Sequence, residues 1–175
     1  MAELQTRQQA LAYLTQMSPT ETFQVQPIQK GWVATKVLMP EQMASGQALG
    51  LARLVIDSET GIVYQYPSWS ETMVAEAYTT FKETGFNRGG SRIYPRQSRI
   101  TIRRVREDAQ TIDYQMTVES LTDPPTPTQQ NPLTIEKQTL AHEPKGWLAS
   151  VATSHAEWMS RQNHGVWPEV ATTEV

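Results

Sequence analysis

Two neighbouring segments in the middle of the chain alternate strictly between apolar and polar residues. Ile100 and Ile102 alternate with polar side chains, and residues 112, 114, 116 and 118 are apolar in the same manner. This period of two is typical of a strand that packs one face against a core. Residues 107–110 separate the segments, so we expect an antiparallel hairpin. This hairpin constrains the fold strongly, because it requires a sheet with one covered face.

The side chains also predict how the hairpin pairs. Setting Ile102 opposite Tyr114 places apolar side chains together and puts Arg103 beside Asp113. A slip of one residue would set apolar side chains opposite polar ones, which a one-sided core disfavours. Val105, the next apolar residue of the first strand, does not continue the alternation of Ile100 and Ile102. We therefore expect a β-bulge near Arg103–Arg104.

The pattern of residues 3–85 predicts a unit in which a helix is followed by four strands and a second helix. Residues 49–56 are almost continuously apolar, which is typical of a central strand with both faces covered. The last helix of the unit should begin at a capping box in which Ser68 is the cap and Glu71 reaches back. It should end at Gly85, a residue that readily takes the left-handed conformation of a helix C-cap.

The remaining residues predict an extension of the same domain, with three strands and a helix over residues 99–162. We therefore expect one α+β domain over residues 1–162, with an antiparallel sheet of about six or seven strands and three packed helices. Residues 163–175 should form a C-terminal tail, docked through Trp167. The last helix, from Trp147 to about residue 162, carries a stripe that we expect to pack on the sheet: Leu148, Val151, Ala152, His155, Trp158 and Met159.

Composition and motifs exclude several classes of protein. The absence of cysteine excludes a disulfide framework, thiol nucleophiles and cysteine-ligated metals. The three histidines lack the spacing of a zinc site, and no phosphate loop or nucleophile elbow occurs. We therefore predict a protein that is not an enzyme and that holds no metal or cofactor. The chain contains no apolar stretch of about 20 residues and its N-terminus lacks a signal-peptide pattern, so we expect a cytoplasmic location.

The charges of the chain are unevenly distributed. The formal net charge of its 175 residues is −3, yet residues 88–106 carry seven arginines and no acidic residue. Arginine binds carboxylates and phosphates through two parallel hydrogen bonds. Three interpretations stay open: neutralisation within the fold by Asp113 and Glu119, an acidic protein partner, or nucleic acid. The negative net charge disfavours nucleic acid.

The aromatic residues separate into core candidates and one candidate anchor. We expect Trp32, Trp147 and Trp158 to pack in the core. Trp69 lies in a turn before a helix, where an aromatic side chain can serve as a binding anchor. The residues that we predict to bind a partner are Trp69, Arg88, Arg92, Tyr94, Arg96, Arg99 and Arg103.

Residues 8–85 carry a series of motifs in a characteristic order. A helix that reads QQALAYL is followed by Gly31-Trp32-Val33, then by the segment from Leu54 to Val63 with Asp57-x-x-Thr60-Gly61 at its turn, and then by a helix that contains Tyr78. This order resembles the Immunity protein 35 family, whose members are thought to neutralise bacterial toxins. The resemblance covers about half of the chain and implies a toxin-binding function without catalysis.

Taken with the resemblance, these patterns predict a non-enzymatic binding protein, an immunity protein that occludes a toxin with an acidic surface. One alternative is a cystatin-like or cone-shaped α+β domain that binds a small ligand, or acts as an enzyme, through a pocket near His155. Another alternative is a structural or adaptor subunit of a larger assembly.

Overall fold

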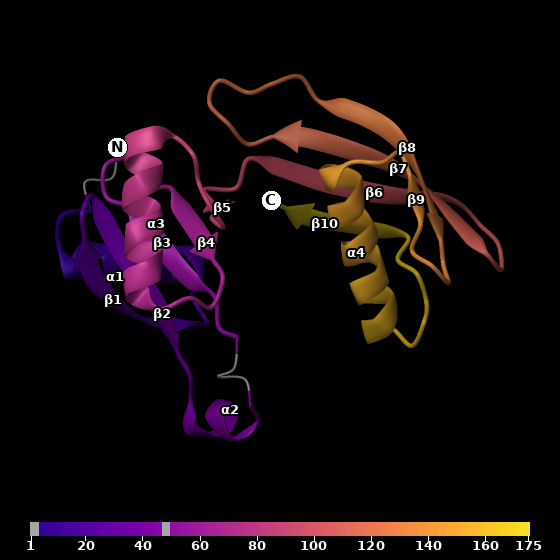
Figure 1. Cartoon of the computed structure of the whole chain (residues 1–175). Coiled ribbons are helices and arrows are strands. Elements are labelled where there is room, and N and C mark those ends of the chain that lie inside the picture. Colours follow the sequence, from indigo (N-terminus) through magenta and orange to yellow (C-terminus); the bar gives the residue numbers. More distant parts are fainter. Residues whose placement is uncertain (1–3, 47–49) are drawn as a thin grey trace. The chain divides into compact units, whose positions relative to one another are not determined.

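The computed structural model describes residues 4–46 and 50–175, and the chain divides into two compact units, Met1–Pro95 and Arg96–Val175. Among the described residues each unit contains one five-stranded antiparallel sheet; three longer helices pack on these sheets, whereas the short helix α2 (Pro40–Ala44) projects away from the strands and buries none of its residues (Figure 1). The predicted α+β class is confirmed. The strands form two sheets, where the sequence predicted one sheet of six or seven strands with three helices.

The first unit contains three helices and a sheet whose strands lie in sequence order, β1-β2-β3-β4-β5. Residue 3 and Leu49, with which two of the predicted segments begin, lie outside the described residues. The elements are α1 (Arg7–Met17), β1 (Thr22–Ile28), β2 (Gly31–Val37), α2 (Pro40–Ala44), β3 (Arg53–Asp57), β4 (Val63–Tyr66), α3 (Glu71–Thr84) and β5 (Ser91–Tyr94).

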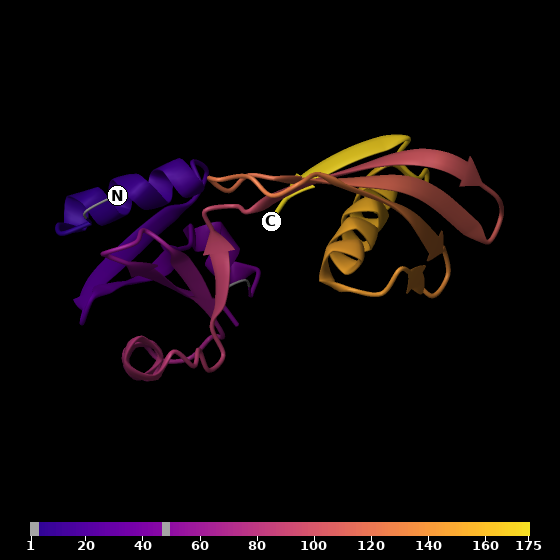
Figure 2. The same cartoon turned by 90° about the horizontal axis from the view of Figure 1, so that it is seen from above.

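Helices cover both faces of this first sheet. Figure 2 shows α1 and α3 on opposite sides of it. On the α1 side, Leu14 packs with Ile56, whereas on the α3 side Val55 packs with Tyr78. Successive residues of β3 therefore enter two different cores, which explains why this strand is apolar throughout. The prediction of a central strand with two covered faces is confirmed.

The caps of α3 differ in part from the prediction. The Ser70 side chain, rather than that of Ser68, accepts a hydrogen bond from the Met73 amide at 3.2 Å. The Trp69 amide donates to the Pro67 carbonyl at 2.7 Å, and this tight turn delays the start of the helix by two residues. Gly85 ends the helix in the left-handed conformation, with φ 77°, as predicted.

The second unit packs a single helix on a sheet with strand order β10-β6-β7-β8-β9. Its core lies between α4 and the apolar face of the β6–β7 hairpin. The elements are β6 (Ser98–Glu107), β7 (Thr111–Ser120), β8 (Gln129–Glu136), β9 (His142–Glu143), α4 (Trp147–Gln162) and β10 (Val170–Glu174).

The predicted hairpin forms, but its register differs by two residues. Ile102 lies opposite Met116 rather than Tyr114, and the pairing shifts between Arg104 and Arg106. A bulge therefore lies beside the predicted position. The side chain of Asp108 accepts hydrogen bonds from two backbone amides of the turn and so fixes where β7 begins. A shift of two residues keeps every side chain on its predicted face.

The C-terminal residues form a strand rather than a tail. β10 pairs with β6 from Val170 to Glu174, and the Trp167 side chain is buried in the core of the second unit. Within β10 only Ala171 is buried, so this segment lacks the apolar alternation that would identify a strand from sequence.

The buried face of α4 coincides only in part with the predicted stripe. Ala152 is buried, and Leu148, Val151 and Met159 are partly buried against the core, as predicted. Small side chains face the sheet: Ala149, Ala152, Thr153, Ala156 and Ser160. Trp147 and Trp158, which we expected in the core, are 66% and 56% exposed. The small residues let the helix axis lie close to the sheet, and the two tryptophans lie on the side of the helix that faces solvent. His155 lies at the edge of that outer face and stacks on Trp158, with ring centroids 6.0 Å apart.

Candidate functional site

The predicted partner-binding residues divide between the two units. Trp69, Arg88, Arg92 and Tyr94 belong to the first unit, and Arg96, Arg99 and Arg103 to the second. In the first unit the structure brings Trp69 and Arg88 together at one cavity beside α3.

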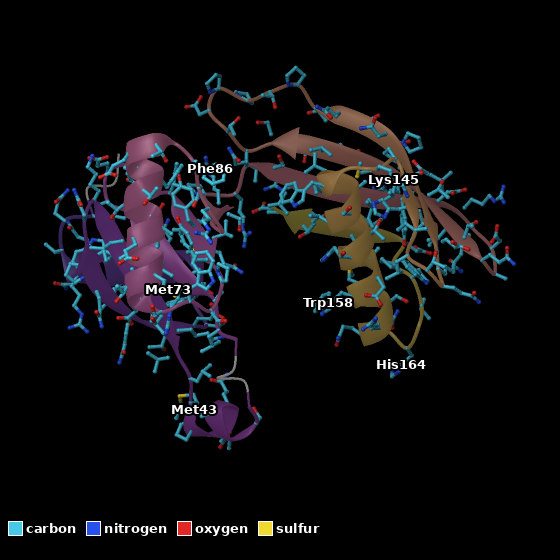
Figure 3. The ribbon with its side chains drawn as sticks, viewed as in Figure 1. Met43, Met73, Phe86, Lys145, Trp158 and His164 are labelled. Carbon is cyan, nitrogen blue, oxygen red and sulfur yellow. The ribbon has the colours of Figure 1, made fainter. Side chains whose placement is uncertain are left out.

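This cavity has a volume of about 280 Å³ and an apolar wall formed by the outer flank of α3. Its helical residues recur at positions 73, 76, 77 and 80, a spacing that places them on one face. Met73 is half exposed there (Figure 3). Trp69 lies at one edge, and the loop after α3 contributes Arg88. The complete lining is Trp69, Met73, Glu76, Ala77, Thr80 and Arg88.

Two contacts hold the Arg88 loop beside the helix. The Tyr66 hydroxyl donates a 2.7 Å hydrogen bond to the Asn87 side-chain oxygen. The indole of Trp69 lies so close to Gly89 that a Cβ at this position would be 2.5 Å from the ring. Gly89 also has a φ of 76°, a conformation that other residues rarely adopt. The loop therefore has a defined position, and Arg88 is placed by its neighbours on both sides.

Tyr66 is a buried residue that contacts both Trp69 and the loop that carries Arg88. Its ring centroid lies 6.3 Å from that of Trp69, and the side chain is 1% exposed. Burial, together with the neighbouring Tyr64, raises the pKa of Tyr66 to about 12, against the opposing effect of the Asn87 hydrogen bond. The hydroxyl is thus a neutral donor at physiological pH and serves to position the loop.

The cavity offers one cation and one carboxylate beside an apolar wall. Arg88 is exposed, and among the described residues neither it nor Glu76 forms an ion pair. A guanidinium without an internal partner is available for a carboxylate from another molecule. The Trp69 and Met73 side chains provide the apolar surface that an aromatic or aliphatic side chain would cover.

Arg92 and Tyr94 lie on β5, at an edge of the first sheet. Arg92 is exposed, pairs in register with Tyr64 and has no ion pair among the described residues. Tyr94 instead packs edge-to-face on Tyr13, with centroids 5.5 Å apart, and the Tyr13 hydroxyl donates to the Gly61 carbonyl at 2.7 Å. Tyr94 therefore connects α1 to the sheet, whereas Arg92 faces solvent.

The arginines of the second unit are neutralised only in part. Arg99 pairs with Glu174 at 2.9 Å, although its neighbour in register is Glu119. Arg104 binds two glutamates, and Arg106 pairs with Asp108. Of the seven arginines in residues 88–106, all of them described by the structure, four form no ion pair with another described residue: Arg88, Arg92, Arg96 and Arg103.

Glu119 lies opposite Arg99 as a neighbour in register, but among the described residues neither it nor Asp113 forms an ion pair with an arginine. Asp113 accepts a hydrogen bond from the Thr134 hydroxyl at 2.7 Å and lies opposite Arg106. Arg103 lies opposite Gln115 rather than Asp113, because the strands pair out from the turn in a different register. The acids that do pair with β6 arginines lie at the end of β6 and in the turn after it (Glu107 and Asp108), and just before and within β10 (Glu169 and Glu174). The sequence pattern identified none of these pairs.

Asp57 is the one buried carboxylate among the described residues, and its hydrogen bonds are internal. One oxygen accepts from the Glu59 and Thr60 amides, and the other accepts from the Tyr78 hydroxyl and the Lys82 ammonium, all within 2.9 Å. Burial alone would raise the pKa of Asp57, but these hydrogen bonds outweigh it and hold the pKa below its usual value. The residue therefore joins the β3–β4 turn to α3.

Residues 4–46 and 50–175 contain no cluster of three or more histidine, aspartate or glutamate side chains that could hold a metal ion. Nor is any of their helices both long and apolar enough to span a membrane.

A model of a known protein family matches most of the first unit. Residues 2–85 match the Immunity protein 35-like domain. The match ends at Gly85, the C-cap of α3, so the domain comprises α1 to α3 and provides five of the six residues that line the cavity. No curated protein and no solved structure matches the chain. The suspected resemblance to the Immunity protein 35 family is confirmed for this half of the chain.

The sequence pattern did not identify Met73, Glu76 and Thr80 as site residues. Their spacing on α3 was visible as a second helical stripe beside the buried one that contains Val74 and Tyr78. The spacing alone does not show that this stripe lines a cavity. The cavity forms because the contacts of Asn87 and Gly89 hold the loop after α3 against the stripe.

Proposed function

We propose that this chain is a bacterial immunity protein, a non-enzymatic cytoplasmic protein that binds a toxin and occludes it. The match of residues 2–85 to the Immunity protein 35-like domain carries this proposal. The solvent-accessible cavity that the same domain builds beside α3 supports it, because the cavity supplies a preformed place for a partner's side chain.

The chemistry of the cavity favours a toxin with an acidic surface. Trp69 and Met73 would cover an apolar side chain of the toxin, and Arg88 would bind a neighbouring carboxylate through two hydrogen bonds. Arg92 in the same unit, and Arg96 and Arg103 in the second, add positive charge without an internal partner. Complementary charge of this kind mainly raises the rate of encounter, and the buried anchor sets the lifetime of the complex.

A growth assay tests the proposal. The chain is co-expressed with the protein encoded directly beside its own gene, and growth is compared with and without the chain. We expect that neighbour to arrest growth and the chain to restore it. A neighbour that is harmless, or one whose toxicity the chain leaves unchanged, contradicts the proposal.

Variants locate the surface in the same assay. Arg88→Glu should weaken protection, because it sets a carboxylate where the toxin's carboxylate binds. Arg7→Glu is the matched control, since Arg7 is an exposed arginine of the same unit, distant in sequence from the cavity lining. Equal protection by both variants would remove the cavity from the proposed interface.

A further inference from the structure

The second sheet has an open border at β10. This strand pairs with β6 and, among the described residues, with no other strand, so it forms one edge of the sheet (Figure 2). Proteins commonly protect such an edge with proline, lysine or a bulge, because free backbone groups there can pair with another chain. The sequence of β10 is Val-Ala-Thr-Thr-Glu, and its register with β6 is unbroken. The strand therefore has none of these protections.

The hydrogen bonds to β6 show which backbone groups of β10 face outward. Val175 and Ser98 exchange both of their backbone hydrogen bonds, each at 2.9 Å, and the Arg104 amide donates to the Glu169 carbonyl. In an antiparallel pair, successive residues alternate between bonding the neighbouring strand and facing away from it. The odd-numbered residues of β10 therefore bond β6. The residues whose amides and carbonyls point out of the sheet are Val170, Thr172 and Glu174.

The side chains of these outward residues lie on the face of the sheet opposite α4. Ala171 is buried in the core under the helix, whereas its neighbours on either side are exposed. Thr172 lies beside Thr101, with their hydroxyl oxygens 3.1 Å apart, and Thr101 in turn lies opposite Thr117. A row of threonines thus crosses three strands and ends at the open edge.

The two ends of β10 differ in charge. Glu174 pairs with Arg99 at 2.9 Å, yet its side chain is still 41% exposed. At the other end Val170 lies beside Arg103, an exposed arginine that forms no ion pair with another described residue. One end therefore offers a carboxylate, and the other lies beside an unpaired guanidinium. An edge with this distribution of charge is complementary to its own reverse.

We propose that β10 pairs antiparallel with β10 of a second copy of this chain, about a two-fold axis beside Thr172. In this register Thr172 lies opposite Thr172 of the second copy, and Val170 lies opposite Glu174 of the second copy. All three outward residues then exchange two hydrogen bonds across the axis, whereas any shifted register leaves some of these groups without a partner in β10. The interface uses the same strand of both copies, as a two-fold axis requires.

The side chains support this register. Arg103 and Glu174 of the second copy lie in one row, separated by Val170, with their Cα atoms about 10 Å apart. The two long side chains can meet above the short valine, so Arg103 gains the carboxylate that it lacks within its own chain. The threonine rows of the two copies join at the axis, and threonine pairs across strands are favourable. This interface is separate from the cavity of the proposed function.

Sedimentation analysis of the intact chain tests the association. We expect the mass to rise with concentration from 19.8 kDa toward twice that value between about 1 µM and about 1 mM. Thr172→Pro should weaken dimerisation by about tenfold or more, because it removes an outward amide and leaves the hydrogen bonds to β6 in place. Thr172→Val keeps that amide and is the matched control. A mass that stays monomeric, or equal dissociation constants for the two variants, overturns the proposal.

Charge reversal tests the register without altering the backbone. Arg103→Glu should weaken dimerisation by about threefold or more, because it sets a carboxylate beside Glu174 of the second copy. Lys145→Glu is the matched control, since it makes the same reversal at an exposed residue beside β9, the opposite edge of the sheet. If Arg103→Glu dimerises as tightly as Lys145→Glu, the proposed pairing is wrong.

A single introduced thiol locates the axis. The chain contains no cysteine, so Thr172→Cys has one thiol, and the two Cα atoms across the axis would lie about 5.5 Å apart, within the range of a disulfide. Thr134→Cys, on β8 in the same sheet, is the control, because seven strand spacings would separate its two copies. Cross-linking of Thr172→Cys that does not exceed the control overturns the register. A monomeric parent chain whose Thr172→Pro variant no longer binds the toxin would assign the edge to a strand of the toxin and would equally overturn the proposal.

Discussion

Replacing Asp57 by asparagine should destabilise the first unit selectively. The variant keeps the shape of the side chain and one oxygen for the Glu59 and Thr60 amides. It loses the carboxylate oxygen that accepts from Tyr78 and Lys82, both at 2.8 Å. The side chain of Asp57 is 3% exposed, so water cannot replace these bonds at that oxygen.

The magnitude follows from what each donor loses. A hydrogen bond to a charged group contributes about 1.5–3 kcal/mol, and this applies in full to the buried Tyr78 hydroxyl. The Lys82 contribution is smaller, because its side chain is 20% exposed and keeps Glu59 as a partner at 3.1 Å. We therefore expect Asp57→Asn to lower the free energy of unfolding of this unit by about 2–4 kcal/mol.

Hydrogen exchange measured by mass spectrometry resolves this loss by region. Peptides from β3, β4 and α3 should lose protection by the stated amount, while peptides from residues 96–175 should change little and serve as an internal reference. Asp113→Asn is the control, because that carboxylate accepts one side-chain hydrogen bond in an exposed setting. A loss below about 0.5 kcal/mol for Asp57→Asn would refute the reasoning.

The same residue gives a dependence on pH. The pKa of Asp57 is lower in the folded state than in the unfolded chain, so its stabilisation is present above the unfolded pKa of about 4. It is lost as the pH falls through the lower folded pKa. The stability of the parent chain should therefore decline in acid more steeply than that of Asp57→Asn, and parallel profiles from urea titrations would contradict this assignment.

Three further variants have defined outcomes. Gly31→Ala should destabilise the first unit by about 2 kcal/mol or more, measured by urea titration, because its Cβ would lie 2.5 Å from the Ile56 carbonyl oxygen. Gly89→Ala should displace the Trp69 ring, seen as a changed near-ultraviolet circular dichroism spectrum, and an unchanged spectrum would argue against the contact. Removing residues 163–175 should expose the β6 edge and lower the urea midpoint of the second unit, whereas a truly loose tail would leave it unchanged.

The sequence predicted best where side-chain alternation is dense. The hairpin of β6 and β7, and the central position of β3, follow directly from apolar patterns that only one strand arrangement can bury. The hairpin register was wrong by two residues because it depends on a bulge and on where Asp108 begins the turn. Such features cost little energy locally, and alternation alone does not distinguish them.

The sequence predicted poorly where small residues decide the packing. On α4 the stripe was extended to His155 and Trp158, but Ala149 and Ala156 face the sheet instead because close approach favours small residues. The tail was missed for a related reason, since β10 buries only Ala171. Division into two units was likewise not visible, because both units continue the same pattern of strands and helix.

For the candidate site, residue types were predicted but not their grouping. Arg88 and Trp69 were selected for separate reasons, and the structure places both at one cavity through contacts made by Asn87 and Gly89. Arg99 and Tyr94 were selected as well, yet each has an internal partner. Pairing of this kind depends on register and on distant strands, which no local pattern encodes.

The affinity of the purified chain for the protein encoded beside its gene tests the central claim most directly. Isothermal titration should detect a complex, and Trp69→Ala should weaken it by about 30-fold, the loss of about 2 kcal/mol that a buried aromatic anchor contributes. Arg7→Glu should bind as the parent chain does. An affinity of Trp69→Ala within about twofold of the parent, or no complex at all, would contradict the account.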